Sequence, residues 1–217
     1  MNLLPQTMQG LQALNYPFAA TEKTLAELIG RYLLLIEKWN KVHNLTAIRH
    51  RQDMLYQHVM DSLSVLPYIN GPQIIDVGSG AGLPGIPIAL ARPDWHVTLI
   101  ESNKKKAAFL QQVKIELALR NLEIMAARVE HARIDRQVNT IITRAFSELG
   151  QFIALTRQWA VKINVNCRWV AMKANCLKEE QNQVQDPFEI EKIVTVTVPG
   201  LDAARQLIII KTTDLED

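Results

Sequence analysis

Four glycines within eight residues follow a short apolar run near the middle of the chain. The stretch reads IIDVGSGAGLPGIPIAL over residues 74–90. A glycine-rich turn of this kind brings backbone close to a nucleotide-like ligand, where a strand hands over to a helix at the carboxyl edge of a parallel sheet. This feature constrains the fold more than any other, because it needs a strand before the turn and a helix after it.

The sequence on either side of the turn alternates between strand and helix patterns. Beyond the strand at 73–77, we predict strands at 96–101, 122–127, 139–146, 168–174, 192–198 and 206–212, with helices at 104–120 and 150–161. The last two strands are separated by PGLDAAR alone, which predicts an antiparallel hairpin at one sheet edge. The fold class is therefore α/β, with a Rossmann-like, mostly parallel sheet of seven strands and helices on both faces. This pattern is typical of class I methyltransferases.

The first 70 residues show a different, wholly helical pattern. Apolar residues recur at helical spacing in 21–42 and again in 51–69, and Asn70-Gly71-Pro72 ends the second helix. We therefore predict an N-terminal helical extension over residues 1–70, packed on a catalytic domain over residues 71–217.

Composition excludes several classes of protein. The 217 residues carry a net charge of +2, and the two cysteines, Cys167 and Cys176, match no zinc spacing. The start of the chain lacks a secretory signal pattern, and no gap-free apolar run is long enough to span a membrane. We expect a cytoplasmic monomer with no metal and no membrane segment.

The glycine turn can be aligned in two registers, which predict different ligands. Gly78-x-Gly80-x-Gly82 suggests a methyl donor, whereas Gly80-x-Gly82-x-x-Gly85 suggests a dinucleotide. The first register fits better, because the strand ends at Val77 and Gly80 comes three residues later. Asp76 also favours it, since a carboxylate there would repel a pyrophosphate and would favour the cationic groups of S-adenosylmethionine.

A second carboxylate stands at the end of the next predicted strand. Glu101 follows Gly78 by 23 residues, and an acid at this spacing can accept both hydroxyls of a ribose. This feature serves NAD and S-adenosylmethionine equally well. The alternative is an ordinary solvated carboxylate at a strand end.

Five motifs in order resemble the bacterial small-subunit rRNA guanine-N7 methyltransferase family, also called glucose-inhibited division protein B. They are HNLTAIR (43–49), HVMDS (58–62), IDVGSGAGLPGIPIAL (75–90), KKKAAFL (104–110) and ITRAF (142–146). The resemblance implies a class I methyltransferase fold and S-adenosylmethionine as the cofactor. It also implies methylation of N7 of guanine 527, in the 530 loop of 16S rRNA within the 30S subunit.

Site residues follow from the matching motifs. Gly78 and Leu83 are expected to contact the cofactor, Val129 and Glu130 to flank its adenine, and Arg144 to line the site near cofactor and guanine. With the residues argued above, the predicted cofactor set is Asp76, Gly78, Gly80, Gly82, Leu83, Glu101, Val129, Glu130 and Arg144. The chain departs from the family in having Glu101 where Asp is frequent, and Ala174 where glycine commonly follows Lys173.

The expected chemistry needs no general base, because guanine N7 has a free lone pair and no proton to lose. The chain has TRAF in place of the Asn/Asp-Pro-Pro-aromatic loop of exocyclic-amine methyltransferases, and neither cysteine follows a proline, as a C5 nucleophile would. Catalysis would rest on alignment of N7 with the methyl group. We expect Arg144, the candidate catalytic residue, to hold O6, a phosphate or the cofactor carboxylate; the alternative is an ordinary ion pair.

RNA contacts are predicted from local charge. Residues 101–144 carry nine lysines and arginines against five acids, a net of +4. The candidate RNA-binding residues are Lys104, Lys105, Lys106, Arg128 and Lys173, although a lysine run can also be a solvated face. A polar set near the N-terminus forms either a pocket wall or a structural network: His43, Asn44, Thr46, Arg49, His58 and Asp61.

Two rival functions stay open from the sequence. One is an NAD-linked oxidoreductase that uses the offset glycine register. The other is a non-catalytic RNA-binding ribosome-assembly factor that keeps the fold.

Overall fold

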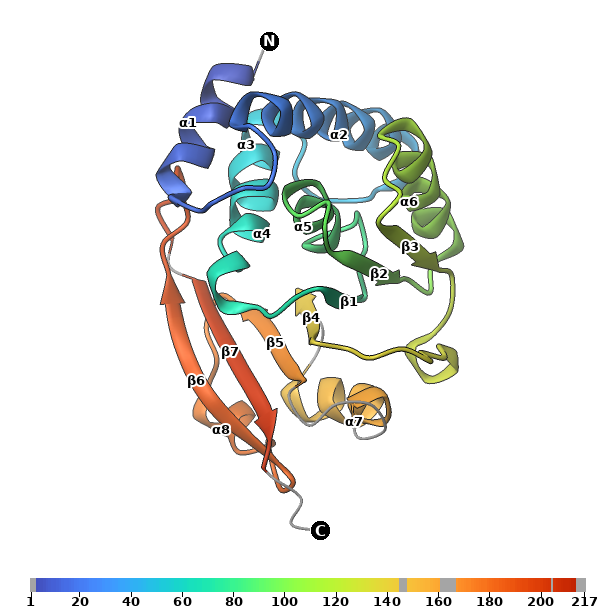
Figure 1. The fold of residues 1–217 in the computed structure, drawn as a ribbon, viewed down its shortest axis with the longest axis vertical. Helices are drawn as coiled ribbons and strands as arrows, with labels where there is room; N and C mark the ends of the chain where they lie inside the picture. Colours follow the sequence, from blue (N-terminus) through green and yellow to red (C-terminus); the bar gives the residue numbers. More distant parts are fainter. Residues whose placement is uncertain (1–2, 145–147, 161–166, 204, 214–217) are drawn as a thin grey trace.

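The computed structural model describes residues 3–144, 148–160, 167–203 and 205–213. Its centre is a seven-stranded sheet in the order β3-β2-β1-β4-β5-β7-β6 (Figure 1). The strands are β1 (Gln73–Val77), β2 (His96–Ile100), β3 (Leu122–Met125), β4 (Thr140–Arg144), β5 (Arg168–Lys173), β6 (Phe188–Val196) and β7 (Arg205–Thr212). The first five are parallel, whereas β7 runs antiparallel to both β5 and β6. The predicted fold class and edge hairpin are confirmed.

Helices cover both faces of this sheet. On one face lie the N-terminal helices with α5 and α6, and on the other lies α7 (Figure 1). The α-helices are α1 (Leu4–Leu14), α2 (Glu22–His43), α3 (Arg51–Met54), α4 (Asp61–Leu63), α5 (Gly85–Ala91), α6 (Lys104–Glu116), α7 (Leu149–Ala160) and α8 (Lys178–Gln181). The shorter helical segments are the π-helix η1 (Leu55–Met60) and the 3-10 helices η2 (Leu66–Tyr68) and η3 (Val129–His131).

Several boundaries differ from the predicted ones. The helix predicted at 51–69 is interrupted, because its middle turn widens to the π-helix η1. The helix predicted to reach residue 120 ends at Glu116, and Ala118 already has a left-handed φ of 52°. Strand β6 begins four residues before the predicted start at residue 192. Residues 145, 146 and 161, at the ends of a predicted strand and a predicted helix, lie outside the described residues.

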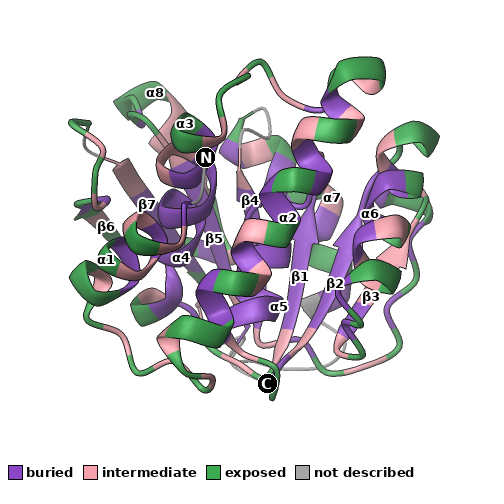
Figure 2. Cartoon of the chain, turned by 90° about the horizontal axis from the view of Figure 1, so that it is seen from above, coloured by how far each residue is buried: buried purple, intermediate pink, exposed green. Residues whose placement is uncertain are grey.

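Two apolar layers hold the fold together, one on each side of the buried sheet (Figure 2). The larger layer joins side chains of α2 and of the segment 54–66 to side chains of α5, β2 and α6. The N-terminal helices therefore share one hydrophobic core with the sheet. The division into a helical extension over residues 1–70 and a catalytic domain over residues 71–217 stays a prediction.

One glycine in this helical layer has no packing reason in the structure. Gly30 lies inside α2, and a Cβ added there would meet nothing within 4 Å. Because glycine in a helix interior is about 0.5–1 kcal/mol less favourable than alanine, Gly30→Ala should raise the free energy of unfolding by about that amount. Urea denaturation measures it. Gly10→Ala in α1 is the matched control and should gain less stability, because its Cβ would lie 2.8 Å from the Met60 sulfur and the methionine side chain would have to shift. A loss of stability in Gly30→Ala would contradict the prediction.

None of the helices in the described part of the chain is long and apolar enough to cross a membrane.

Candidate active site

All three glycines of the first register have left-handed backbone conformations. Gly78, Gly80 and Gly82 have φ values of 71°, 57° and 91°. Gly85 instead begins α5, where an added Cβ would collide with the Leu99 side chain and approach the carboxylate of Asp76. Space beside Gly80 is open, because a Cβ there would come no nearer than 3.9 Å to its nearest neighbour. The turn therefore presents backbone at Gly80 and keeps Gly85 for close packing of helix on strand.

Asp76 lies beneath the turn and is fully buried. Its Oδ2 accepts a hydrogen bond from the Gly85 amide at 2.9 Å, so the carboxylate ties the start of α5 to the end of β1. Its Oδ1 is buried and meets no donor among the described residues. Burial raises the pKa of Asp76 to about 7, against the smaller opposing effects of the Gly85 amide and Arg144. A cationic ligand group nearby would stabilise the ionised form.

This raised pKa predicts a pH dependence of stability. Asp76 ionises near pH 3.8 when unfolded and near pH 7 when folded, so the parent loses stability as pH rises from about 4 to about 7. Asp76→Asn removes the ionisation. The free energy of unfolding of the variant, relative to the parent, should therefore rise across this window and level off above it.

Denaturation at a series of pH values measures this difference. Asp94→Asn is the control, because Arg92 lowers the pKa of that exposed carboxyl. Its free energy of unfolding relative to the parent should fall as pH rises, and this change should be confined to acidic pH. A difference for Asp76→Asn that stays flat between pH 4 and 7 would contradict the buried-carboxyl account.

Glu101 connects the turn to the next loop. It is buried, its Oε2 accepts from the Gly80 amide at 2.8 Å, and its Oε1 accepts from the Asn103 amide at 2.7 Å. Each carboxylate oxygen has two lone-pair directions, so both can still accept a hydroxyl. The alternative of a merely solvated carboxylate is wrong, although the predicted ribose contact itself stays a prediction.

A cavity of about 190 Å³ opens beside the turn. Three residues of the predicted site line it: Gly78 of the turn, with Val129 and Glu130 of η3. Arg128, Ser102 and Gln151 also contribute to its wall. The structure thus brings together residues that follow β1, β2 and β3 with Gln151 of α7.

A second cavity, of about 340 Å³, contains Arg144 at the end of β4. The guanidinium donates to the Gln57 carbonyl at 3.1 Å and pairs with Asp61 at 3.3 Å. Arg205, at the start of β7, pairs with the other oxygen of the same buried carboxylate at 3.1 Å. Two arginines therefore share one carboxylate at the wall of this cavity. The ion pair expected as the alternative for Arg144 is present. Arg144 also lines the cavity, so a role toward a ligand stays a prediction.

His58 belongs to the same cavity and is neutral at physiological pH. Burial, aided by the charge of Arg144, lowers the pKa of His58 to about 4. Its Nε2 lies 2.8 Å from the Thr46 hydroxyl, and its Nδ1 lies 3.4 Å from Arg144. His58 sits on the π-helix η1, a distortion that often marks functional sites. His58 links the N-terminal helices to Arg144. It is therefore part of the pocket wall and part of a structural network, the two alternatives that the sequence left open.

The remaining predicted residues are the buried Leu83 and Gly82 and the candidate RNA-binding cations. Leu83 and Gly82 are buried, and the Leu83 side chain lies in the apolar core on the helical side, so only its backbone faces the turn. Lys104 and Lys105 are exposed on the first turn of α6, and Arg128 is exposed beside the smaller cavity. Lys173 lines the larger cavity and pairs with Glu180.

Some residues of the N-terminal polar set lie at the larger cavity, and others lie away from it. Thr46, His58 and Asp61 form the network behind Arg144. Arg49 donates to Asn44 at 3.2 Å on the exposed loop, and the ring of His43 packs at a tilt against Trp39, away from the cavity. Sequence reasoning missed Arg205. The antiparallel last strand gave a usable signal for Arg205, because such a strand must begin at the carboxyl edge of the parallel ones.

Metal binding has no support in the part of the chain that the structure describes. No group of three or more histidine, cysteine, aspartate or glutamate side chains there is arranged to hold an ion. Cys167 and Cys176 are buried free thiols, and burial raises the pKa of each.

Comparison with solved structures shows the class of fold. A methyltransferase dependent on S-adenosylmethionine from Aquifex aeolicus superposes with a TM-score of 0.55, at 15% identity, over 74% of this chain and 93% of that one. Magnesium protoporphyrin IX methyltransferase from Synechocystis PCC 6803, solved with bound S-adenosylmethionine, gives 0.54 at 13% identity, over 83% of this chain and 97% of that one. The fold is that of a class I methyltransferase.

Sequence comparison narrows this to one family. The family model described as rRNA small subunit methyltransferase G matches residues 25–209. A protein of that name from Nitrosomonas europaea is 47% identical over 211 residues, which cover 97% of this chain and 98% of the relative. The chain belongs to the rRNA small subunit methyltransferase G family, and it is a methyltransferase. Membership decides against the NAD-linked oxidoreductase.

Proposed function

We propose that the chain uses S-adenosylmethionine to methylate N7 of one guanine in the 530 loop of 16S rRNA. The observation that carries this proposal is the pair of cavities at the carboxyl edge of the sheet. One is lined by the glycine turn, and the other by two arginines around a buried carboxylate. They lie at the carboxyl ends of β1 and β4, the neighbouring strands between which the strand order reverses. Ligands bind at this point in open α/β sheets.

The residues of the glycine turn and of the adjacent smaller cavity fit the cofactor. The open space at Gly80 admits a ligand against the backbone, and Glu101 keeps acceptor capacity for two hydroxyls. When Asp76 is ionised, its Oδ1, which meets no donor among the described residues, supplies a negative potential suited to a cationic ligand. We propose that Gly78, Gly80, Gly82 and Leu83 hold it through backbone, with Val129 and Glu130 beside its adenine. When bound, S-adenosylmethionine supplies an electrophilic methyl group.

The larger cavity suits a nucleobase whose methylation requires no proton to be removed. His58 is a weak base there, because its pKa is held at about 4 and both ring nitrogens contact other groups. Guanine N7 needs no proton abstraction, unlike an exocyclic amine. Arg144 would orient the base through O6 or a phosphate, because a donor placed on N7 would block its lone pair. Positioning of this kind supports roughly 7–11 kcal/mol of rate enhancement in well-aligned systems.

Cations at the same edge would hold the RNA backbone. Lys104, Lys105 and Lys106 lie at the start of α6, directly after β2, whereas Arg128 lines the smaller cavity and Lys173 lies in the larger one. Contacts of this type fix position without reading sequence, and they weaken as salt is raised. We also propose that the chain acts as a monomer on ribosomal RNA in the cytoplasm.

Methyl transfer tests the proposal directly. The purified chain is incubated with labelled S-adenosylmethionine and 30S subunits, 50S subunits or naked 16S rRNA from cells that lack the modification. We expect label in 16S rRNA and none in 50S subunits, together with binding of S-adenosylhomocysteine and none of NADH in calorimetry. Donor binding without label in 16S rRNA would point instead to a non-catalytic RNA-binding assembly factor.

A further inference from the structure

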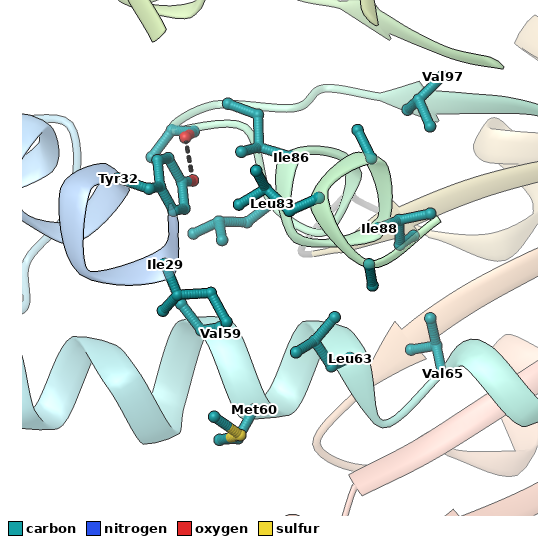
Figure 3. Packing of buried hydrophobic residues seen from close by; sticks show 14 of the residues in the cluster. Ile29, Tyr32, Val59, Met60, Leu63, Val65, Leu83, Ile86, Ile88 and Val97 are labelled. Atoms are coloured by element: carbon teal, nitrogen blue, oxygen red, sulfur yellow. Dashed lines mark hydrogen bonds between the residues drawn. The ribbon is translucent and has the colours of Figure 1, made fainter. Parts of the chain in front are cut away.

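One hydrogen bond joins the N-terminal helical layer to the glycine turn. The hydroxyl of Tyr32, on α2, donates to the carbonyl of Ala81 at 2.6 Å (Figure 3). The side chain of Tyr32 is fully buried, and Ala81 is 4% exposed. The two residues are 49 positions apart, so this contact exists only because α2 packs on the turn.

Ala81 occupies the most adaptable part of the turn. It stands between Gly80 and Gly82, both in left-handed conformations. The other hydrogen bonds of the turn run to the sheet or stay local: Gly78 donates to Ile100, and Gly82 donates to Ser79. The Tyr32 bond is therefore the one that reaches the turn from the helical layer among the described residues.

The surroundings of Tyr32 keep this bond intact. Burial raises the pKa of Tyr32, so its phenol stays protonated and remains a donor. Ile29, Leu83 and Ile86 lie around the ring in the apolar core (Figure 3). Leu83, whose side chain does not face the ligand edge, thus helps to seat the turn on α2.

Because glycines flank Ala81 on both sides, ordering the backbone there costs conformational entropy. Glycine populates many backbone conformations, and a ligand that binds a glycine turn must order any freedom that remains. A contact that fixes the turn before binding removes that cost from the binding equilibrium. The Tyr32 hydroxyl is placed to do so without touching the ligand.

We propose that Tyr32 is a positioning residue for the cofactor, and that the N-terminal helices are thereby part of the cofactor site. The Ala81 carbonyl, held by Tyr32, keeps the turn in its ligand-ready conformation. This inference rests on the proposed use of S-adenosylmethionine.

Tyr32→Phe removes the hydroxyl and leaves the ring. We expect the Kd for S-adenosylhomocysteine, measured by calorimetry, to rise about threefold to tenfold, the range for loss of one hydrogen bond. Without ligand, amide hydrogen exchange at residues 80–83 should become faster. Tyr16→Phe is the matched control: Arg92 donates to the Tyr16 hydroxyl at 2.9 Å, at the far end of α5, and this variant should change neither quantity.

The outcomes separate this inference from the function beneath it. If the parent chain does not bind S-adenosylhomocysteine, the cofactor assignment fails, and a cofactor role for Tyr32 fails with it. If the parent binds but Tyr32→Phe binds as tightly, with unchanged exchange at residues 80–83, the positioning role alone is overturned.

Discussion

Replacing Gly80 with aspartate should abolish detectable binding of S-adenosylhomocysteine while the protein still folds. The position has a left-handed φ of 57°, which aspartate tolerates better than most residues, and the space beside it is open. The new side chain would fill that space, where backbone is proposed to approach the ligand. It would also bring a second carboxylate toward Glu101, which accepts the Gly80 amide.

Calorimetry with S-adenosylhomocysteine measures this loss, and circular dichroism reports on folding. Gly30→Asp is the matched control, because that glycine also has open space around it but lies in α2, away from the ligand edge. A folded Gly80→Asp variant that binds as tightly as the parent would show that the cofactor does not lie against this turn.

Arg144→Lys should lower the rate of methyl transfer by about 100-fold, the cost of losing one well-placed donor in an active site. Lysine keeps a positive charge beside Asp61, so the buried carboxylate is not left with Arg205 alone. It lacks the planar fork of arginine, which can hold two acceptors at once. Single-turnover transfer to 30S subunits separates this effect from product release.

A neighbouring arginine provides the comparison. Arg168→Lys alters an ion pair with Glu191 at the opposite end of the adjacent strand, and it should leave transfer unchanged. Transfer by Arg144→Lys within about threefold of the parent would reduce Arg144 to a structural ion pair, since loss of a working donor costs far more. A selective loss of cofactor affinity would instead place Arg144 on the cofactor carboxylate.

Much of this site follows from local sequence because strands and turns obey local rules. β1 runs from Gln73 to Val77, as the β-rich run predicts, and the three positive-φ glycines stand in the predicted register. Glu101 lies at the sheet edge because it directly follows β2. The parallel sheet then brings these ends together, which is why spacing alone indicated a ligand site.

Other features depend on packing between distant segments, and no local pattern encodes them. The widening of the helix at η1 sets the position of His58 toward Arg144, yet its apolar spacing is that of an ordinary helix. Asp76 was expected to face a ligand, but its carboxylate also binds the Gly85 amide beneath the turn. The contact of Tyr32 with Ala81 requires the docked layers themselves.

Mapping the modified nucleotide tests the central claim most directly. 30S subunits that lack the modification are incubated with the protein and S-adenosylmethionine, and the 16S rRNA is then cleaved chemically at N7-methylguanine. The account predicts one new cleavage site, at a guanine of the 530 loop, that is absent when the Gly80→Asp variant is used. Methyl transfer to another atom, to another region of the RNA, or to no RNA at all would contradict it.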